Sequence, residues 1–369
     1  MTAETLQAPY DAVLLVSFGG PEQAADVLPF LENVTRGRGI PPERLADVAR
    51  HYDAFGGRSP INDQCRSFLA AVRADFDDHG VDLPLYWGNR NWDPYLTDTV
   101  ARMQSDGVRR AAAFVTSAYS SYSGCRQYRE NLFDAVDPLV GPPRIDKLRH
   151  YFNHPGFVRA FVDTTVAELE SLPDEDRADA RLVFVTHSIP STMAETAGPS
   201  GGAYVDQHRS AAALVAAGVR TATGLAAQWD LVHCSRSGSP RTPWLEPDVN
   251  DHLTALKERG TRAVVVVPVG FVSDHMEVVY DLDTEAAETA RGLGLTMRRA
   301  ATAGTHPDFV AVVRDLLRER AAVERGDDVP RAAAGDRGPS WDVCAATCCP
   351  NLRAPRPALC ELPMPPSAA

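Results

Sequence analysis

The sequence predicts a doubly wound α/β protein with enough strands for two parallel sheets. Short runs rich in Val, Leu and Phe recur along the chain, and an amphipathic stretch of helical period follows each of them. The runs are apolar throughout rather than alternating, which is typical of strands whose two faces are both covered by helices. A length of 369 residues is enough for two such domains.

The expected elements are taken in chain order. Strands are expected at 12–17, 85–88, 111–116, 182–186, 230–233 and 263–267. Helices with an apolar stripe are expected at 62–78, 157–172, 249–259 and 307–324. The chain is expected to change sheets near 142–153, which gives an N-terminal α/β domain over 8–150 and a C-terminal one over 151–306.

The end of the chain differs from the rest. The helix at 307–324 is expected to close the body and to pack back on the N-terminal domain. After it, residues 326–369 hold eight prolines and four of the seven cysteines, with little periodicity. Such a composition indicates an appended tail rather than a third domain.

Composition and charge exclude several classes of function. Lys and Arg total 37 against 49 Asp and Glu, and the resulting net charge of −12 argues against a nucleic-acid partner. No run approaches the ~20 apolar residues of a membrane span, so we expect no stable membrane insertion. Residues 1–10 carry neither a basic nor an apolar signal region, so we expect a cytoplasmic protein without a disulfide framework.

Residues capable of metal and proton chemistry follow two of the expected strands. His187 comes directly after 182–186, and Glu277 follows the strand at 263–267. Asp281 and Glu285 continue from Glu277 at i+4 and i+8, a spacing that stacks carboxylates on one face of an α-helix. A neutral imidazole facing carboxylates suits a divalent first-row metal such as iron. The alternatives are a hydrogen-bonded structural histidine and a solvated acidic face.

Arginines and aromatic residues form a second group. Arg36 and Arg38 follow the first helical stretch, Arg58 and Ser59 follow a Gly-Gly pair, and Tyr128 comes after the third strand. Arginines near aromatic hydroxyls can hold a flat ligand with several carboxylates through bidentate pairs. Each arginine taken singly is better explained as an ordinary surface charge. The segment 87–92, with two tryptophans, is interpreted as a packed corner.

The cysteines of the tail indicate a metal or cluster site. Cys344, Cys348, Cys349 and Cys360 lie close in sequence, and Cys125 can supply a further thiolate from a loop of the body. Clustered thiolates suit zinc or an iron–sulfur cluster, although the spacing matches no zinc finger. Reduced, exposed thiols are the alternative.

Taken together, these segments resemble the ferrochelatases, and among them the actinobacterial coproporphyrin ferrochelatases with a C-terminal [2Fe–2S] cluster. The matching segments span residues 13 to about 285 in the order of the family, and they are 14–22, 35–38, 51–60, 186–190, 235–238 and 270–277. The resemblance implies two similar Rossmann-like domains of the chelatase type, with a porphyrin cleft between them. It implies insertion of Fe²⁺, as a substrate, into a porphyrin.

The resemblance also implies residue roles. His187 matches the histidine that coordinates the metal or accepts pyrrole protons, and Glu277 matches the carboxylate facing it across the porphyrin plane. Asp281 and Glu285 match an acidic track. Further positions match porphyrin or propionate contacts, and these are Ser59, Tyr128, Arg36, Arg38 and Arg58. Phe18 is a departure, because some bacterial members carry an iron-ligating tyrosine there.

For the cluster, the resemblance implies one cysteine from the body and three from the tail. Cys125 is the expected body ligand. The favoured tail ligands are Cys344, Cys349 and Cys360, with Cys348 as the substitute.

The resemblance implies that the segment 20–45 forms the entrance of the porphyrin cleft. This entrance segment is polar and arginine-bearing, with prolines at 21, 29, 41 and 42. This favours coproporphyrin III over protoporphyrin IX as the substrate, with a downstream coproheme-processing enzyme as a partner. Two rivals are a chelatase that inserts cobalt into a corrin precursor and a non-catalytic haem or iron sensor.

Overall fold

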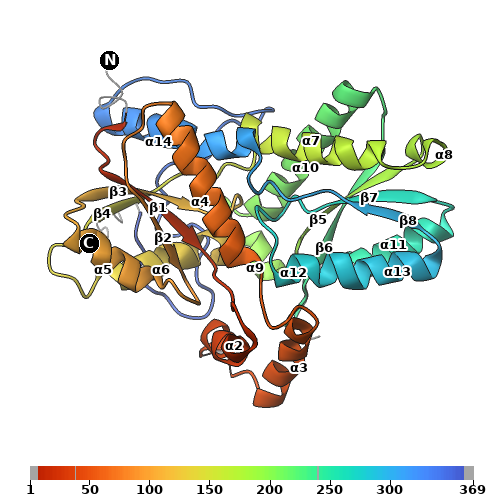
Figure 1. Ribbon diagram of the computed structural model, residues 1–369, viewed down its shortest axis with the longest axis horizontal. Helices are drawn as coiled ribbons and strands as arrows, with labels where there is room; N and C mark the ends of the chain where they lie inside the picture. Colours follow the sequence, from red (N-terminus) through yellow and green to blue (C-terminus); the bar gives the residue numbers. More distant parts are fainter. Residues whose placement is uncertain (1–6, 38, 239–240, 361–369) are drawn as a thin grey trace, which may run out of the picture.

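Two four-stranded parallel sheets form the body of the protein (Figure 1). The computed structural model describes residues 7–37, 39–238 and 241–360. The first sheet has the order β2-β1-β3-β4 and the second has the order β6-β5-β7-β8, so the two domains share one topology. All neighbouring strands are parallel. The predicted pair of doubly wound α/β domains is therefore confirmed.

The strands lie close to their predicted positions, with one addition in each sheet. The first sheet contains β1 (Ala12–Ser17), β2 (Leu85–Asn89), β3 (Arg110–Val115) and β4 (Arg144–Lys147). The second contains β5 (Arg181–His187), β6 (Trp229–Cys234), β7 (Ala263–Val267) and β8 (Thr296–Arg299). The strands β4 and β8 were not expected from the sequence, and both lie at the edge of their sheet.

Helices cover both faces of the first sheet. Val13 and Leu15 of β1 pack on the side of α4, whereas Leu14 and Val16 pack on the side of α5 and α6. This alternation explains why β1 is apolar from Ala12 to Val16. The helices of this domain are α4 (Ile61–Asp78), α5 (Leu96–Ser105) and α6 (Gln127–Val136).

The second sheet repeats this arrangement. Leu182 and Phe184 of β5 face α7 and α10, and Val183 and Val185 face α11 and α13. The helices of this domain are α7 (Pro155–Glu170), α8 (Asp174–Arg177), α9 (Ser191–Glu195), α10 (Ala203–Thr223), α11 (Val249–Glu258), α12 (Met276–Val279) and α13 (Ala287–Leu293).

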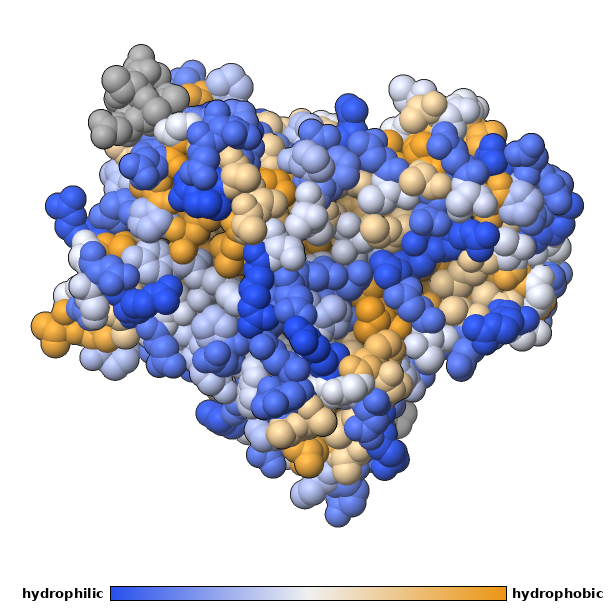
Figure 2. Space-filling model, in the orientation of Figure 1, coloured by the Kyte–Doolittle hydropathy of each residue, from blue (hydrophilic) through white to orange (hydrophobic). Residues whose placement is uncertain are grey.

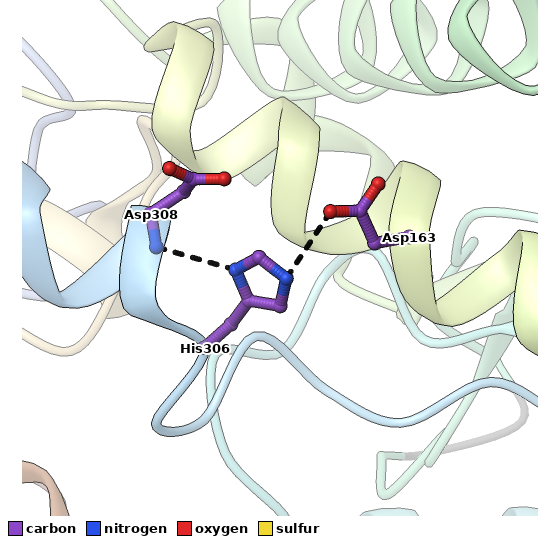
Figure 3. A group of neighbouring side chains, drawn as sticks. All are labelled: Asp163, His306 and Asp308. Carbon is purple, nitrogen blue, oxygen red and sulfur yellow. Dashed lines mark hydrogen bonds and ion pairs between the residues drawn. The ribbon is translucent and has the colours of Figure 1, made fainter. Parts of the chain in front are cut away.

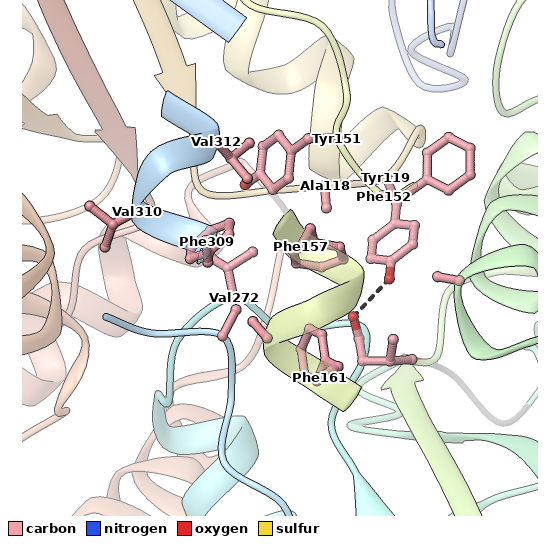
Figure 4. Close-up of a cluster of buried hydrophobic side chains, with 14 of the residues drawn as sticks. Ala118, Tyr119, Tyr151, Phe152, Phe157, Phe161, Val272, Phe309, Val310 and Val312 are labelled. Carbon is pink, nitrogen blue, oxygen red and sulfur yellow. Dashed lines mark hydrogen bonds between the residues drawn. The ribbon is translucent and has the colours of Figure 1, made fainter. Parts of the chain in front are cut away.

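One apolar core runs through both domains, and α14 (Pro307–Arg325) lies across it on α4 and α7 (Figure 4). The ring centroid of Phe309 lies 5.3 Å from that of Phe68 in the first domain and 5.7 Å from that of Phe157 in the second. The Tyr119 hydroxyl donates a hydrogen bond to the carbonyl oxygen of Val269 over 2.8 Å. These contacts hold the carboxyl ends of the two sheets in a fixed relation.

A small lobe projects from the body between the two sheets (Figure 1). It is built from η1 (Ala24–Asp26), α2 (Val27–Thr35) and α3 (Pro42–Asp53). Its own core includes Phe30 and Tyr52, and Met276 of α12 packs into that core from the second domain. The rings of His51 and Tyr280 stack at 4.0 Å with 7° between their planes, so the lobe also contacts the second domain at this point.

The tail runs back over the body after α14. From 326 to 360 its described residues contain no helix or strand. Arg149 Nη2 donates to Glu319 Oε2 over 2.9 Å and to the Ala332 carbonyl over 2.7 Å. Arg331 bonds Glu319 on one side and Asp342 on the other, each over 3.0 Å. The buried Arg149 and the half-buried Arg331 thus hold the tail on the body in the absence of regular secondary structure.

The described part of the chain has no helix that is both long and apolar enough to cross a membrane. Figure 2 shows hydrophilic residues over most of the visible face, with apolar residues scattered between them. In the entrance segment 20–45, the exposed large apolar residues are Leu28 and Ile40, at 49% and 37%.

Candidate active site

The structure places His187 and Glu277 together at the carboxyl ends of neighbouring strands. His187 is the last residue of β5, and Glu277 lies on α12, which follows β7 after a short loop. His275 Nδ1 accepts a hydrogen bond from the Glu277 backbone N–H over 3.2 Å and so caps α12. Ligands of open α/β sheets bind at such strand ends, so the location agrees with a reactive site.

His187 and Glu277 form a hydrogen-bonded ion pair. Nε2 of His187 lies 3.3 Å from Glu277 Oε1, and Nδ1 donates to the Ser188 carbonyl oxygen. Burial alone lowers the pKa of His187, but the charge and hydrogen bond of Glu277 outweigh it and raise the pKa to about 9. Burial acts against Glu277 too, yet the charge of His187 holds the pKa of that carboxyl below its usual range. The Ser188 bond leaves Nε2 as the nitrogen that exchanges a proton or meets a metal.

This contact bears on how a porphyrin can lie. A flat ring between two groups needs a contact of about 3.5 Å on each face, or roughly 7 Å in all. The 3.3 Å between Nε2 and Oε1 leaves no room for a macrocycle between His187 and Glu277. The family arrangement expected from the sequence, with the two groups on opposite faces, therefore differs from the arrangement in this structure.

Asp281 lies behind the pair and is held by Ser235. The Ser235 hydroxyl donates to Asp281 Oδ2, and Ser235 has a φ of +62°, an uncommon conformation for a residue with a side chain. Burial raises the pKa of Asp281 to about 7, with Glu277 and Glu285 adding to it and the Ser235 bond opposing it. A strained backbone that aims a hydroxyl at a carboxyl indicates a functional constraint. Ser235 was noted in the sequence as part of a motif but received no role.

The carboxylates do not share one continuous α-helix, and that expectation is wrong. α12 ends at Val279, and η3 (Asp281–Ala286) is a π-helical turn that leads into α13. The Glu285 backbone N–H bonds the carbonyl of Tyr280, five residues back, over 3.0 Å. The extra residue in this turn shifts the direction of the later side chains, and Glu285 is exposed.

Aromatic residues of the first domain form a wall near the start of α4. Phe18 packs edge to face on Phe30 of the lobe, with ring centroids 6.3 Å apart. The Arg90 guanidinium lies 5.5 Å from the ring centroid of Phe18 and 4.5 Å from that of Tyr128. Arg90 was missed because the segment 87–92 was interpreted only as a packed corner. A cation between aromatic residues was the signal that could have found it.

The other predicted contact residues are placed as follows. Ser59 is buried, and its N–H bonds the carbonyl of Pro21 over 2.9 Å. Arg36 is exposed and bonds Asn33, and Arg58 is exposed and pairs with Asp63. Arg38 lies outside the described residues.

Four of the five candidate cysteines pack together. Cys125, Cys344, Cys348 and Cys349 form one buried cluster between the tail and η2 (Tyr122–Arg126). Hydrogen bonds from Cys344 and Cys349 hold the pKa of the Cys125 thiol well below its usual range, against the effect of burial. Cys360 points elsewhere, since its Sγ accepts from the Lys147 N–H over 3.1 Å.

This group differs from the favoured set of the sequence, which took Cys360 and left Cys348 as the substitute. The structure brings Cys348 to the other three, because Cys348 and Cys349 both turn inward, with 3.8 Å between their sulfurs. The Cys349 backbone reaches this turn at a φ of +52°.

A second group of possible ligands, Asp163, His306 and Asp308, is a helix cap (Figure 3). His306 Nδ1 accepts from the Asp308 backbone N–H over 3.3 Å, so the ring proton of the neutral form lies on Nε2. That nitrogen faces Asp163 Oδ2 at 3.3 Å. Both ring nitrogens are thus engaged at the positive end of α14, where the helix dipole disfavours a cation.

Two similar parallel-sheet domains with a histidine and carboxylates at the strand ends define a protein of the chelatase class. Among solved structures, the chain is similar to SirB from Bacillus subtilis with Fe3+, at a TM-score of 0.52 and 13% identity. The match covers 85% of this chain and 97% of that chain, and at this identity it shows the fold alone.

The ferrochelatase family matches residues 10–321, and the chain belongs to this family. The coproporphyrin III ferrochelatase of Streptomyces griseus is 59% identical over 360 residues, which cover 95% of this chain and 96% of the relative. That of Frankia alni is 55% identical, with 95% and 89% covered. A relative from Rhodopirellula baltica, named ferrochelatase, is 49% identical, with 92% and 93% covered.

Proposed function

We propose that this protein inserts Fe²⁺ into coproporphyrin III in haem biosynthesis and releases two pyrrole protons. The observation that carries the proposal is the His187–Glu277 pair at the strand ends of a chain that matches a coproporphyrin III ferrochelatase over 95% of its residues. Imidazole and carboxylate together are ligands that suit ferrous iron. The iron stays ferrous, so the reaction needs no redox partner.

The residues of the site have two roles in this reaction, metal binding and proton transfer. Fe²⁺ meets Nε2 of His187 and the carboxylate of Glu277, and both groups act from one face of the porphyrin because they touch each other. The metal competes with the proton that the pair holds. Asp281, whose pKa is raised to about 7, can take up and release protons near neutral pH, and Glu285 continues the path to solvent.

The first domain supplies the opposite wall. Phe18, Ser59 and Tyr128 line it, and Arg90 offers a cation beside the aromatic rings for a carboxylate of the substrate. Arg36 and Arg58 are exposed, and they stay candidates for contacts with propionates. Phe18 has no oxygen to offer to the iron of the product.

Coproporphyrin III is favoured over protoporphyrin IX by the entrance segment and by the names of the relatives. A substrate with four carboxylates suits an entrance of mixed polarity, and it suits an enzyme that works in the cytoplasm. The product must pass to an enzyme that processes coproheme.

The test is anaerobic insertion of Fe²⁺ into coproporphyrin III and protoporphyrin IX, followed by the Soret absorbance. We expect faster turnover of coproporphyrin III. Faster turnover of protoporphyrin IX would contradict the proposal that coproporphyrin III is the substrate. Tight binding of haem with no turnover of either porphyrin would favour the alternative function of a haem or iron sensor. A preference for Co²⁺ and a corrin precursor would favour a cobalt chelatase.

We also propose that the four packed cysteines hold a [2Fe–2S] cluster. The donor set fits, because all four thiols are buried and two sulfurs accept N–H hydrogen bonds of the kind that tune cluster ligands. Gly198 N–H donates to Cys349 Sγ over 3.1 Å, and Trp341 Nε1–H donates to Cys344 Sγ over 3.2 Å. The cluster would supply one-electron chemistry and a covalent tie between the tail and the body.

The cysteine variants test this ligand set. The protein purified without oxygen is expected to contain iron, acid-labile sulfide and visible sulfur-to-iron absorption. Cys349→Ser is expected to lose them, whereas Cys360→Ser is expected to keep them, because Cys360 Sγ bonds the Lys147 N–H instead. If Cys360→Ser lost the iron and sulfide and Cys348→Ser kept them, the ligand set favoured by the sequence would be correct instead. Zinc in place of iron and sulfide would contradict the proposed [2Fe–2S] cluster.

A further inference from the structure

Arg299 stands apart from the residues assigned so far, yet it contacts both segments that carry the carboxylates. It is the last residue of β8, and its backbone pairs with Val266 of β7, the strand that leads into the Glu277 loop. Its side chain is only 18% exposed. The backbone of Arg299 is therefore held in the sheet and not in a loop.

The guanidinium of Arg299 binds two carboxylates at once. Nε and Nη2 donate to the two oxygens of Asp283, each over 2.8 Å, in a bidentate pair. Nη1 donates to Asp274 Oδ1 over 3.1 Å. Asp283 belongs to the π-turn, two residues from Asp281, and Asp274 belongs to the loop before α12, three residues from Glu277.

The loop that Arg299 holds is also fastened to the first domain. The Asp274 backbone N–H donates to Gln64 Oε1 of α4 over 2.8 Å. α4 begins two residues after Ser59 of the aromatic wall. The contacts thus run from the wall of the first domain through Asp274 and Arg299 to the π-turn.

A π-turn needs such a support. Its geometry is rare, and return to an α-helix would turn each later side chain by about 100°. The Asp283 pair fixes the turn from outside, while Thr284 Oγ1 donates to the Val279 carbonyl over 3.3 Å within it. Lysine could not replace the fork, because a single ammonium lacks the planar pair of donors that meets Asp283.

We propose that Arg299 is a positioning residue for iron: it holds the Glu277 loop and the π-turn in one arrangement, so that Glu277 meets the ion while Asp281 stays beside it to exchange protons. The predicted change in the KM for Fe²⁺ rests on the proposed iron insertion. The predicted stabilisation of the π-turn by Arg299 does not depend on that activity.

The experiment compares Arg299→Gln, Arg299→Lys and Asp283→Asn with Arg298→Gln in the full chain. Arg298 is the matched control, since it is the exposed neighbour on the same strand and bonds Ser171. Insertion is measured with Fe²⁺ varied at saturating coproporphyrin III and the reverse. Hydrogen exchange of the amides from 276 to 287 is measured on the same proteins, together with their thermal unfolding.

We expect the KM for Fe²⁺ to rise roughly tenfold in Arg299→Gln and Arg299→Lys, while the KM for the porphyrin changes less than about twofold. Adding Asp283→Asn to Arg299→Gln should cause no further loss, because both remove the same pair. Exchange should speed up across the π-turn in these variants and not in Arg298→Gln.

An unchanged KM for Fe²⁺ in Arg299→Gln, or the same loss in Arg298→Gln, would overturn the positioning of iron. If the wild-type protein inserted no iron, the proposed function would be wrong. Hydrogen exchange would then test by itself whether Arg299 stabilises the π-turn. Equal exchange of the π-turn in Arg299→Gln and wild type would then overturn the inference.

Discussion

Replacing His187 by alanine is expected to lower the rate of iron insertion by roughly 10²- to 10⁴-fold, the usual effect of losing a group that moves protons at the reacting centre. The imidazole is lost as a ligand, and Glu277 loses the partner that lies 3.3 Å away. Anaerobic turnover of coproporphyrin III by Soret absorbance gives the rate. Porphyrin binding, followed by fluorescence quenching, should change little because the aromatic wall lies on the other domain.

A matched control exists within the same domain. His306 also pairs with a carboxylate, Asp163, at 3.3 Å, but it caps α14 and lies outside the site (Figure 3). His306→Asn keeps a side-chain acceptor for the cap and is expected to keep wild-type turnover. A rate within about threefold of wild type in His187→Ala would remove His187 from the chemistry.

Some of the fold follows from local sequence and some does not. β1 and β7 have the boundaries that were predicted, because every residue in them is buried and all but Ser17 are apolar. β4 and β8 were missed since their sequences, RIDK and TMRR, carry charges. Both are edge strands, and an edge strand pairs on one side only and tolerates charged residues. Their assignment depends on the neighbouring strand, which no local pattern reports.

The site shows the same division. The approach of His187 to Glu277 follows from parallel strands, whose carboxyl ends meet at one edge of the sheet. The π-turn could not be predicted, because the i, i+4, i+8 spacing of its carboxylates is also that of an ordinary α-helix. One contact that holds the π-turn comes from Arg299 on β8, which lies 16 residues after Asp283. Such a contact is tertiary and leaves no periodic signal.

The choice among the cysteines fails for a different reason. The tail has no periodicity, so its path over the body is set by single contacts of arginines such as Arg149 and Arg331. Spacing alone made adjacent Cys348 and Cys349 look awkward as joint ligands. The positive φ of Cys349 turns both sulfurs inward, and sequence spacing gives no sign of that conformation.

Gly270→Ala is expected to lower both the unfolding free energy and the turnover, although it leaves every functional side chain in place. A Cβ at Gly270 would lie 2.7 Å from the Cα of Thr186, closer than real Cβ atoms approach backbone. Thr186 cannot easily yield, because its hydroxyl lies 3.0 Å from the Tyr204 hydroxyl and 2.8 Å from His208 Nε2. The strand end before His187 and the loop before Glu277 must then move apart. We expect a loss of about 1–3 kcal/mol in unfolding free energy, measured by denaturant titration.

The same substitution should cost activity beyond its cost in stability, since a misplacement of about 1 Å at a reacting centre can lower a rate roughly 10²-fold. Turnover is therefore measured well below the unfolding transition, where the variant is folded. The control is Gly292→Ala on α13, where a Cβ meets nothing within 4 Å, and where alanine should add about 0.5–1 kcal/mol of stability. If Gly270→Ala matched Gly292→Ala in both stability and turnover, close approach of β5 and the β7 loop would not be what sets the distance between His187 and Glu277.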